Sequence, residues 1–377
     1  MLDQALVGDH AQDFLHPYLG ETESLFRTAL QAVDDEADCK ITPAADLGFP
    51  ADVVRFAGGF ASGCLVEWSS SSEVVPVDTC TGVDTSSIFW LDDFPSPEIR
   101  DEDLVRLEKW LVSTSTYVWN FHQGNHFIML VRRRTDGAPA LVMHSSEGEF
   151  TYQSTGLLPG NDNWYIKDVV TTYSPASDRY IRLLWGDKAS LYKRMSRTLR
   201  SYARDRHALV ATMLLDGRAR IGSEYHKQHF YMPSSNSAAL GCYLCQPNEV
   251  VPIFSAPSRD IDMFRCSMGG KNDINLLNGR RVILVPHGWG RTMTSEVDCA
   301  VEGGRISLNG ETYPVEPRVS IASHPQMGLR EFDDSSLSSG SFYGVIEGHT
   351  PGNVIDSLAQ IWSYSSAGYV HHSTPRQ

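Results

Sequence analysis

Apolar positions along the chain follow two periods, which predict helices in some stretches and strands in others. In four stretches apolar residues recur at three- and four-residue steps, the spacing of a helix with one buried face. These predicted helices are Glu21–Asp38, Glu102–Thr114, Asp187–Leu215 and Pro351–Val370. The helix over Asp187–Leu215 is the longest, and its first half, Lys188–Arg206, is basic while its second half is apolar.

Short apolar runs bounded by turn-forming residues predict the strands. "HFIMLVRR" and "PALVMHSS" are joined by "RTDGA", which predicts a β-hairpin. Tyr231–Asp273 and Gly304–Ser341 combine short apolar runs with glycine, proline and serine, which indicates further strands and loops. Because strands and helices alternate irregularly, the pattern predicts the α+β class rather than a doubly wound parallel sheet.

The composition is that of a globular protein with an acidic surface. The 377 residues are 41% hydrophobic and 21% charged, and the net charge of −14 argues against a surface that is coated throughout by nucleic acid. The first residues lack the basic and apolar regions of a signal peptide, and no run of about 18 apolar residues predicts a membrane span. The seven cysteines are irregularly spaced, so we expect a reducing, cytoplasmic setting.

The stretch "VILVPHGWGR" ends a buried-type strand on a histidine. Gly288 and Gly290 allow a close approach of the backbone or a positive φ angle. Arg291 can donate to phosphate oxygens, and a neutral His287 can attack phosphorus and hold the product as a phosphoramidate. The alternative interpretation is a strand end followed by a glycine turn without catalytic function.

Histidines at the ends of apolar runs indicate a metal site. His126 and His144 each adjoin a predicted strand, and a cysteine lies in the turn "VDTCTGVD". Imidazole and thiolate ligands suit zinc, manganese, iron or cobalt, and added carboxylate oxygen favours manganese. The spacing matches no standard metal motif, and each histidine considered alone is explained as a core or surface residue.

Five segments taken in order resemble the RtcB family of RNA-splicing ligases. They are "VDTCTGV", "QGNHFIML", "LVMHSSEGEF", "SEYHKQHFYM" and "VPHGWGR". The closing stretch, Pro351–Val370, also resembles the last helix of that family. The resemblance implies one RtcB-like domain over residues 71–377, with mixed or antiparallel sheets around a central metal cleft, preceded by a poorly matched segment over residues 1–70.

The resemblance implies a role for each matched residue. His287 becomes the nucleotidylated nucleophile, and Arg291 holds a substrate phosphate. A nucleoside triphosphate and two Mn²⁺ ions are the implied cofactors. The implied metal ligands are Asp78, Cys80, His126, His144 and one of His226 and His229, while Asn125, Phe127, Gly288 and Gly290 lie at the nucleotide.

The chain departs from the family at the positions that read guanine and hold RNA. Met129 replaces a guanine-contacting glutamate, so the cofactor is either GTP or another nucleoside triphosphate. Gly148 and Ser295 stand where the family has arginines. The cysteine of the first turn is displaced by one position: Thr81 stands where the family has its cysteine, and Cys80 precedes it. The chain also lacks the lysine-glycine end and is short for the family.

Three functions follow from these features. The first is Mn²⁺-dependent joining of RNA 3′-phosphate and 5′-hydroxyl ends, with Lys188–Arg206 as a replacement contact for the RNA backbone. The alternative interpretation of that basic segment is a solvated helix face. The second function is nucleotidyl transfer to a small-molecule phosphate or carboxylate in a specialised pathway. The third is a catalytically inactive, metal-binding relative.

Overall fold

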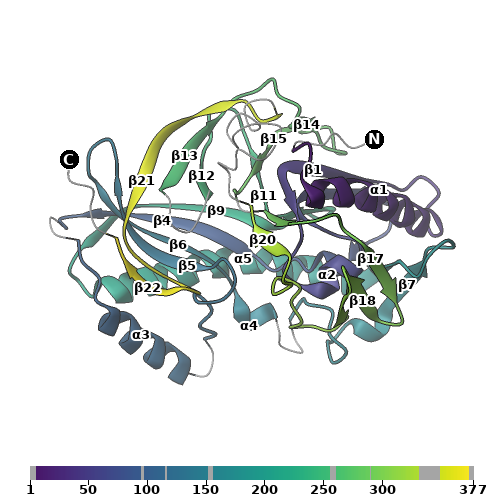
Figure 1. Cartoon of the computed structure of the whole chain (residues 1–377), viewed down its shortest axis with the longest axis horizontal. Coiled ribbons are helices and arrows are strands. Elements are labelled where there is room, and N and C mark those ends of the chain that lie inside the picture. Colours follow the sequence, from purple (N-terminus) through teal and green to yellow (C-terminus); the bar gives the residue numbers. More distant parts are fainter. Residues whose placement is uncertain are drawn as a thin grey trace.

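The computed structural model describes residues 6–94, 97–114, 117–151, 156–254, 260–288, 290–330 and 349–372. Within these residues helices and strands are interleaved along the chain (Figure 1). The strand pairings found there are antiparallel. The α+β class predicted from the sequence is confirmed, because helices and mainly antiparallel sheets build one structure.

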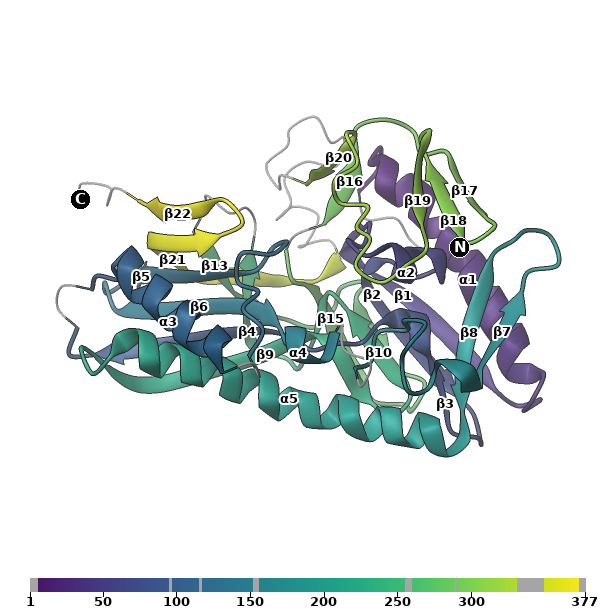
Figure 2. The same ribbon diagram turned by 90° about the horizontal axis from the view of Figure 1, so that it is seen from below.

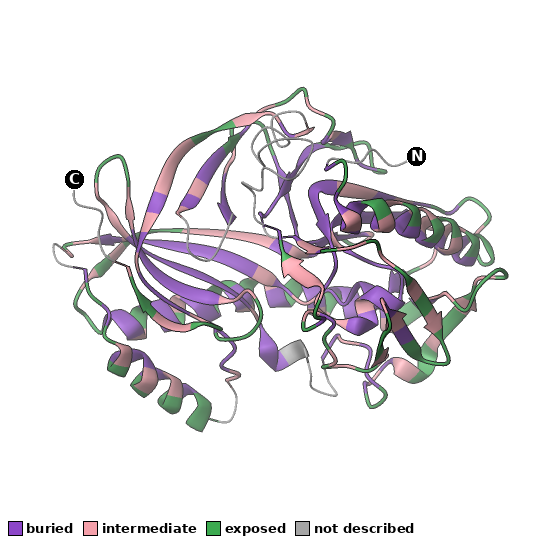
Figure 3. Ribbon diagram, viewed as in Figure 1, coloured by how far each residue is buried: buried purple, intermediate pink, exposed green. Residues whose placement is uncertain are grey.

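One 11-stranded sheet organises the molecule, and Figure 3 shows that its central strands are mostly buried. Its order is β1-β2-β10-β9-β4-β6-β5-β21-β13-β12, with β22 paired to β21. Because β1 and β2 lie within residues 1–70, the N-terminal segment and the remainder of the chain share this sheet. The strands are β1 (Asp38–Gly48), β2 (Ser62–Ser69), β4 (Asp84–Asp92), β5 (Phe127–Arg133), β6 (Pro139–Ser146), β9 (Arg220–Ser234), β10 (Ser237–Leu240), β12 (Val250–Phe254), β13 (Ile261–Cys266), β21 (Gly352–Ser365) and β22 (Gly368–His371).

Smaller sheets flank the large one. They follow the orders β11-β15-β14, β3-β8-β7, β17-β18-β19 and β16-β20. Their strands are β3 (Val74–Pro76), β7 (Val169–Tyr173), β8 (Tyr180–Trp185), β11 (Cys242–Cys245), β14 (Asp273–Asn275), β15 (Arg281–Pro286), β16 (Arg291–Met293), β17 (Cys299–Glu302), β18 (Arg305–Leu308), β19 (Glu311–Pro314) and β20 (Met327–Leu329).

Two of the predicted helices match the structure closely. They are α3 (Asp101–Ser113) and α5 (Gly186–Leu215), while α2 (Val53–Ala57) and α4 (Gly148–Thr151) are short. Figure 2 shows α5 running beneath β4, β6 and β9, with β16 and β20 toward the opposite side. In the described part of the chain, none of the helices combines the length and apolar character needed to cross a membrane.

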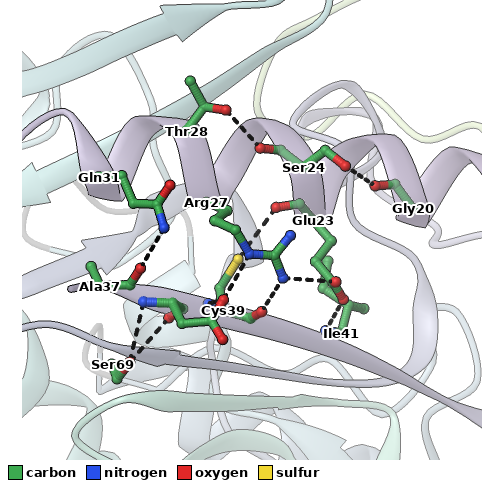
Figure 4. A network of polar contacts seen from close by, with 11 residues as sticks. Gly20, Glu23, Ser24, Arg27, Thr28, Gln31, Ala37, Cys39, Ile41 and Ser69 are labelled. Carbon is green, nitrogen blue, oxygen red and sulfur yellow. Dashed lines mark hydrogen bonds and ion pairs between the residues drawn. The ribbon is translucent and has the colours of Figure 1, made fainter. Parts of the chain in front are cut away.

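The first helix begins earlier than the apolar pattern predicts. Helix α1 spans His10–Gln31, and the Asp9 carboxylate caps its start by accepting from the Gln12 N–H at 3.0 Å. Figure 4 shows how α1 is fixed to β1: Arg27 donates to the Cys39 carbonyl at 2.8 Å, and the Glu23 carboxylate accepts from the Ile41 N–H at 2.7 Å. The end of the predicted helix is instead a turn that leads into β1 at Asp38.

The predicted helix over Pro351–Val370 is wrong, because this stretch forms β21 and β22. Strand β21 pairs with β13 on one side and β5 on the other. The register of β21 against β5 shifts between Gln360 and Trp362, and this β-bulge places Leu358 and Trp362 on opposite faces of the sheet. The bulge interrupts the two-residue period of the strand, which leaves apolar residues at the three- and four-residue steps of a helix.

The two faces of the central strands carry different side chains. Met143 packs in the cluster that includes Val210 and Leu214 of α5, so odd-numbered residues of β6 face α5. Val142 packs with Phe254 on the opposite face, which we call the inner face. His144 shares the parity of Val142, and the alternation of a strand therefore directs its side chain away from α5.

Candidate functional site

A cavity of about 300 Å³ opens on the inner face, where loops from several strands converge. Several residues between Asn120 and His126, in the loop before β5, line the cavity. Cys80, in the turn before β4, and Asp84, at the start of β4, line it as well. His287 follows β15, and Arg291 begins β16. Residues that are far apart in the sequence therefore line one cavity.

Two buried histidines face each other on neighbouring parts of the sheet. The Nε2 atoms of His144 on β6 and His229 on β9 lie 2.9 Å apart. The His144 Nδ1–H donates to the Asn125 carbonyl at 3.0 Å, which leaves a lone pair on its Nε2. Burial lowers the pKa of both histidines well below the usual value, so both rings are neutral near pH 7.

Asp84 completes a group of donors around this pair. The ligand atoms of Asp84, His144 and His229 all lie within 4.8 Å of one another. Within the described residues, Asp84 Oδ1 and His229 Nδ1 are buried without a hydrogen-bond partner. A buried polar atom left without a partner costs about 1–3 kcal/mol, and a bound cation removes that cost for the acceptor.

His126 approaches the same group with its free nitrogen. Its Nδ1–H donates to the Asn120 carbonyl at 3.0 Å, and its Nε2 lies 3.8 Å from Asp84 Oδ1. Burial lowers the pKa of His126, which again favours the neutral ring. Metal-bound histidines usually donate their second N–H to a carbonyl or carboxylate. His126 and His144 have that arrangement, and nitrogen with carboxylate oxygen suits Mn²⁺ or Zn²⁺.

His287 is held by a buried carboxylate. Its Nδ1–H donates to Asp46 Oδ2 at 3.0 Å, and the two residues are 3% and 1% exposed. Its ring stacks on His229 with centroids 4.8 Å apart. No hydrogen bond within the described residues reaches Nε2, and His287 lines the cavity. Asp46 thus fixes the tautomer whose lone pair is available on Nε2.

The glycines on either side of residue 289 permit close packing rather than lining the cavity. Gly288 has a φ of 122°, and a Cβ added there lies 2.3 Å from the Phe254 carbonyl oxygen. A Cβ added at Gly290 lies 2.1 Å from Arg330 Nη1. Arg330 donates in turn to the Asp46 carbonyl at 3.3 Å, so both glycines allow the contacts that place Asp46 and His287.

Arg291 brings an unused cation to the cavity. Among the described residues its guanidinium has no hydrogen-bond or ion-pair partner. Burial, with Arg55 nearby, lowers the pKa of Arg291 from its ordinary value. Arg55 itself is occupied by Asp52 at 3.1 Å and by the carbonyls of Thr79 and Cys80. An anion in the cavity therefore finds free donors on Arg291.

Three predicted metal ligands do not join the group formed by Asp84, His144 and His229. Cys80 lines the cavity, but burial raises the pKa of its thiol well above the ordinary value. The buried Asp78 forms a two-oxygen ion pair with Arg182, with Nε contacts of 3.0 and 3.1 Å. His226 lies on the α5 face, bonded to Ser87 at 2.8 Å and to Glu224 at 3.0 Å.

The remaining predicted residues occupy distinct places. Asn125 lines the cavity and also accepts the His144 bond through its backbone carbonyl. Phe127 is buried beneath the site and stacks on His144 with centroids 5.4 Å apart. The basic part of α5 lies on the far face of the sheet: Lys193 pairs with Glu73 at 2.6 Å, and Arg206 is buried.

Two acidic residues and one amide of the site escaped the sequence prediction. Asp46 is a lone acidic residue in the apolar run "PAADLGFP", and Asp84 follows the predicted cysteine turn. A buried-type strand interrupted by one carboxylate is the signal that identifies Asp46. Asn120 has no comparable signal, since its contribution comes partly from its backbone carbonyl.

The geometry is therefore a histidine nucleophile candidate beside a carboxylate–histidine donor group and a free arginine. Comparison with models of known protein families, with curated proteins and with solved structures found no match to this chain.

Proposed function

We propose that this chain is a metal-dependent nucleotidyltransferase that works through a nucleotidyl-histidine at His287, as the resemblance to the RtcB ligases implies. The observation that carries the proposal is the buried Asp46–His287 hydrogen bond of 3.0 Å. It directs the Nε2 atom of His287 to a cavity that also holds metal-type donors and a free guanidinium. Each of these is a component that phosphoryl chemistry requires.

In the first step the Nε2 lone pair of His287 forms a bond to the α-phosphorus of a nucleoside triphosphate. The bond from that phosphorus to the bridging oxygen breaks, and pyrophosphate leaves with the electron pair. The ring becomes positively charged, and the adjacent Asp46 carboxylate offsets that charge. Asp46 therefore stabilises the transition state more than the ground state, which is the condition for faster reaction.

The residues that would hold metal are Asp84, His144 and His229, with His126 directed at the same point. When bound, a divalent ion such as Mn²⁺ supplies positive charge that offsets the triphosphate. Arg291 donates to a phosphate oxygen of the substrate with donors that no described residue occupies. Asn125, at the wall of the cavity, is placed to contact the nucleotide phosphates.

The second step passes the nucleotide from His287 to a phosphate or carboxylate oxygen, and the N–P bond returns its electrons to Nε2. In the RNA-joining function a 5′-hydroxyl then displaces the nucleotide. One observation favours a small-molecule substrate instead: a Cβ at Gly148 lies 2.7 Å from Val118, which leaves no space for the arginine of the family. The basic residues of α5 also lie beyond the sheet from the cavity.

The test is covalent labelling of the purified protein. It is incubated with Mn²⁺ and each nucleoside triphosphate labelled at the α-phosphorus, then separated by denaturing electrophoresis. Wild type is expected to carry an acid-labile, base-stable label, and His287→Ala none. Equal label on both proteins would overturn the proposal. Metal bound by wild type without any label from any of the nucleotides would identify the catalytically inactive relative.

The second substrate is resolved with the labelled protein. RNA with 3′-phosphate and 5′-hydroxyl ends is offered in one arm, and small phosphates and carboxylates in another. Loss of label with RNA joining supports the ligase function. Loss of label only with small molecules supports transfer in a specialised pathway.

A further inference from the structure

A continuous row of polar side chains runs along the α5 face of the sheet, behind the site. Ser145 Oγ lies 2.7 Å from His207 Nε2 and 2.8 Å from Arg206 Nη1. Ser87 Oγ lies 2.8 Å from His207 Nδ1 and 2.8 Å from His226 Nδ1. We call this row the far-face chain, and its members are Arg206, Ser145, His207, Ser87, His226 and Glu224.

The Glu224 end of the far-face chain sets the direction of its hydrogen bonds. The carboxylate can only accept, so His226 donates its Nε2–H to Glu224 at 3.0 Å and, as a singly protonated ring, accepts from Ser87 at Nδ1. Ser87 has no second proton, so it accepts from the His207 Nδ1–H, and the neutral His207 ring accepts from Ser145 at Nε2. Ser145 in turn accepts from Arg206, which can only donate. All donors point from Arg206 toward Glu224.

Arg206 connects this chain to the loop that carries His126. Its side chain is 1% exposed. While Nη1 is occupied by Ser145, Nη2 donates to the Val118 carbonyl at 2.6 Å and to Asn120 Oδ1 at 2.9 Å. The Asn120 backbone carbonyl then accepts the His126 Nδ1–H at 3.0 Å. The Asn120 amide also donates to the Ser146 carbonyl at 2.8 Å, which anchors the loop to the end of β6.

We propose that Arg206 is a positioning residue for His126, and that the far-face chain holds the guanidinium in the orientation this task needs. A planar guanidinium has donors in fixed directions, so fixing Nη1 on Ser145 also fixes where Nη2 points. Nη2 then fixes the backbone position of residues 118 and 120. The Asn120 carbonyl in turn fixes the tautomer and orientation of the His126 ring. The inference rests on the proposed function only where it treats His126 as a metal donor.

The test measures Mn²⁺ affinity from the free-ion electron paramagnetic resonance signal, without nucleotide. Arg206→Met is expected to weaken binding by roughly 10- to 100-fold, the usual cost of losing a residue that orients a metal ligand. Arg206→Lys is expected to restore little, because an ammonium cannot serve the three acceptors in the same plane. Arg204→Met is the matched control, since Arg204 is exposed and, among the described residues, is paired only with its neighbour Asp205. Wild-type affinity in a folded Arg206→Met protein would overturn the proposal.

A second variant and a second measurement keep the test independent of folding and of catalysis. Asn120→Ala removes the amide that Nη2 holds but keeps the backbone carbonyl, and it is expected to weaken Mn²⁺ binding in the same direction. Nitrogen-15 spectra of the metal-free protein should show His207 and His126 protonated at Nδ1, with the His126 signal lost in Arg206→Met. Retention of that signal would overturn the proposal even if wild type bound no metal. Metal binding without nucleotide labelling would refute only the proposed function.

Discussion

Replacing Asp46 by asparagine is the sharpest perturbation of the proposed nucleophile. The change keeps the size of the side chain and removes one charge. The carboxylate accepts the His287 Nδ1–H at 3.0 Å, and both side chains are almost completely buried. The variant therefore tests whether the charge on Asp46 matters while the packing between β1 and the end of β15 stays nearly the same.

The expected loss follows from the change in charge on the ring. A hydrogen bond to a charged group contributes about 1.5–3 kcal/mol, and here it strengthens as His287 becomes positive. At about 1.4 kcal/mol for each factor of ten, labelling should slow by roughly 10- to 150-fold. If the new amide donates to Nδ1, the proton moves to Nε2 and the loss grows toward about 10⁴-fold.

The assay is single-turnover labelling of His287 by rapid quench at saturating nucleotide and Mn²⁺. Asp136→Asn is the matched control, because Asp136 pairs with Arg133 at an exposed hairpin turn away from the cavity. Thermal unfolding checks that both variants are folded. Labelling of Asp46→Asn at the wild-type rate would refute the assignment of Asp46 as the residue that orients the His287 ring and offsets its positive charge.

Further predictions concern the anion site, the backbone and the buried histidine of the far-face chain. Arg291→Met should raise the apparent KM for the nucleotide about tenfold or more in steady-state labelling, since a charge-assisted bond is lost; an unchanged KM would remove Arg291 from phosphate binding. Gly288→Ala should lower stability by about 1–3 kcal/mol in denaturant unfolding because the φ of 122° strains any side chain, whereas Gly20→Ala, with open space around its position, should be neutral or stabilising. Burial, then Arg206, lowers the pKa of His207 well below 6.5, so the unfolded chain binds a proton first as pH falls. Unfolding free energy should therefore decrease below about pH 6.5 in wild type and decrease less in His207→Gln, and equal pH slopes would contradict this.

The apolar pattern was sufficient for the elements whose period is unambiguous. Helices α3 and α5 and the β5–β6 hairpin follow from it within one or two residues. The helices repeat apolar residues at three- and four-residue steps, and the two strands are continuous apolar runs bounded by turn residues. The helix predicted over Pro351–Val370 failed because a β-bulge between Gln360 and Trp362 interrupts the two-residue period of the strand. Local periodicity has no information on pairing partners, and the pairing of β21 with β5 and β13 decides the conformation.

Sequence motifs located the site better than its details. His126 and His287, predicted at strand ends, line one cavity, and His144 lies beside both, with ring centroids 5.8 Å from His126 and 6.4 Å from His287. His226 and His229 could not be separated by sequence, but three residues along a strand reverse the face, and only His229 reaches the inner face. Asp46 and Arg330 were not predicted because their roles depend on contacts between β1, the end of β15 and the residue after β20, which are remote in sequence.

The donor group also makes the site a reporter of strand register. Asp84, His144 and His229 come from β4, β6 and β9, which are hydrogen-bonded neighbours with Asp84 opposite Ser146 and Phe230. A slip of β6 by one residue would turn its side chains to the other face and replace the His144 nitrogen by the hydroxyl of Ser145. A cation present during folding would therefore stabilise the native alignment of these three strands over its nearest competitors.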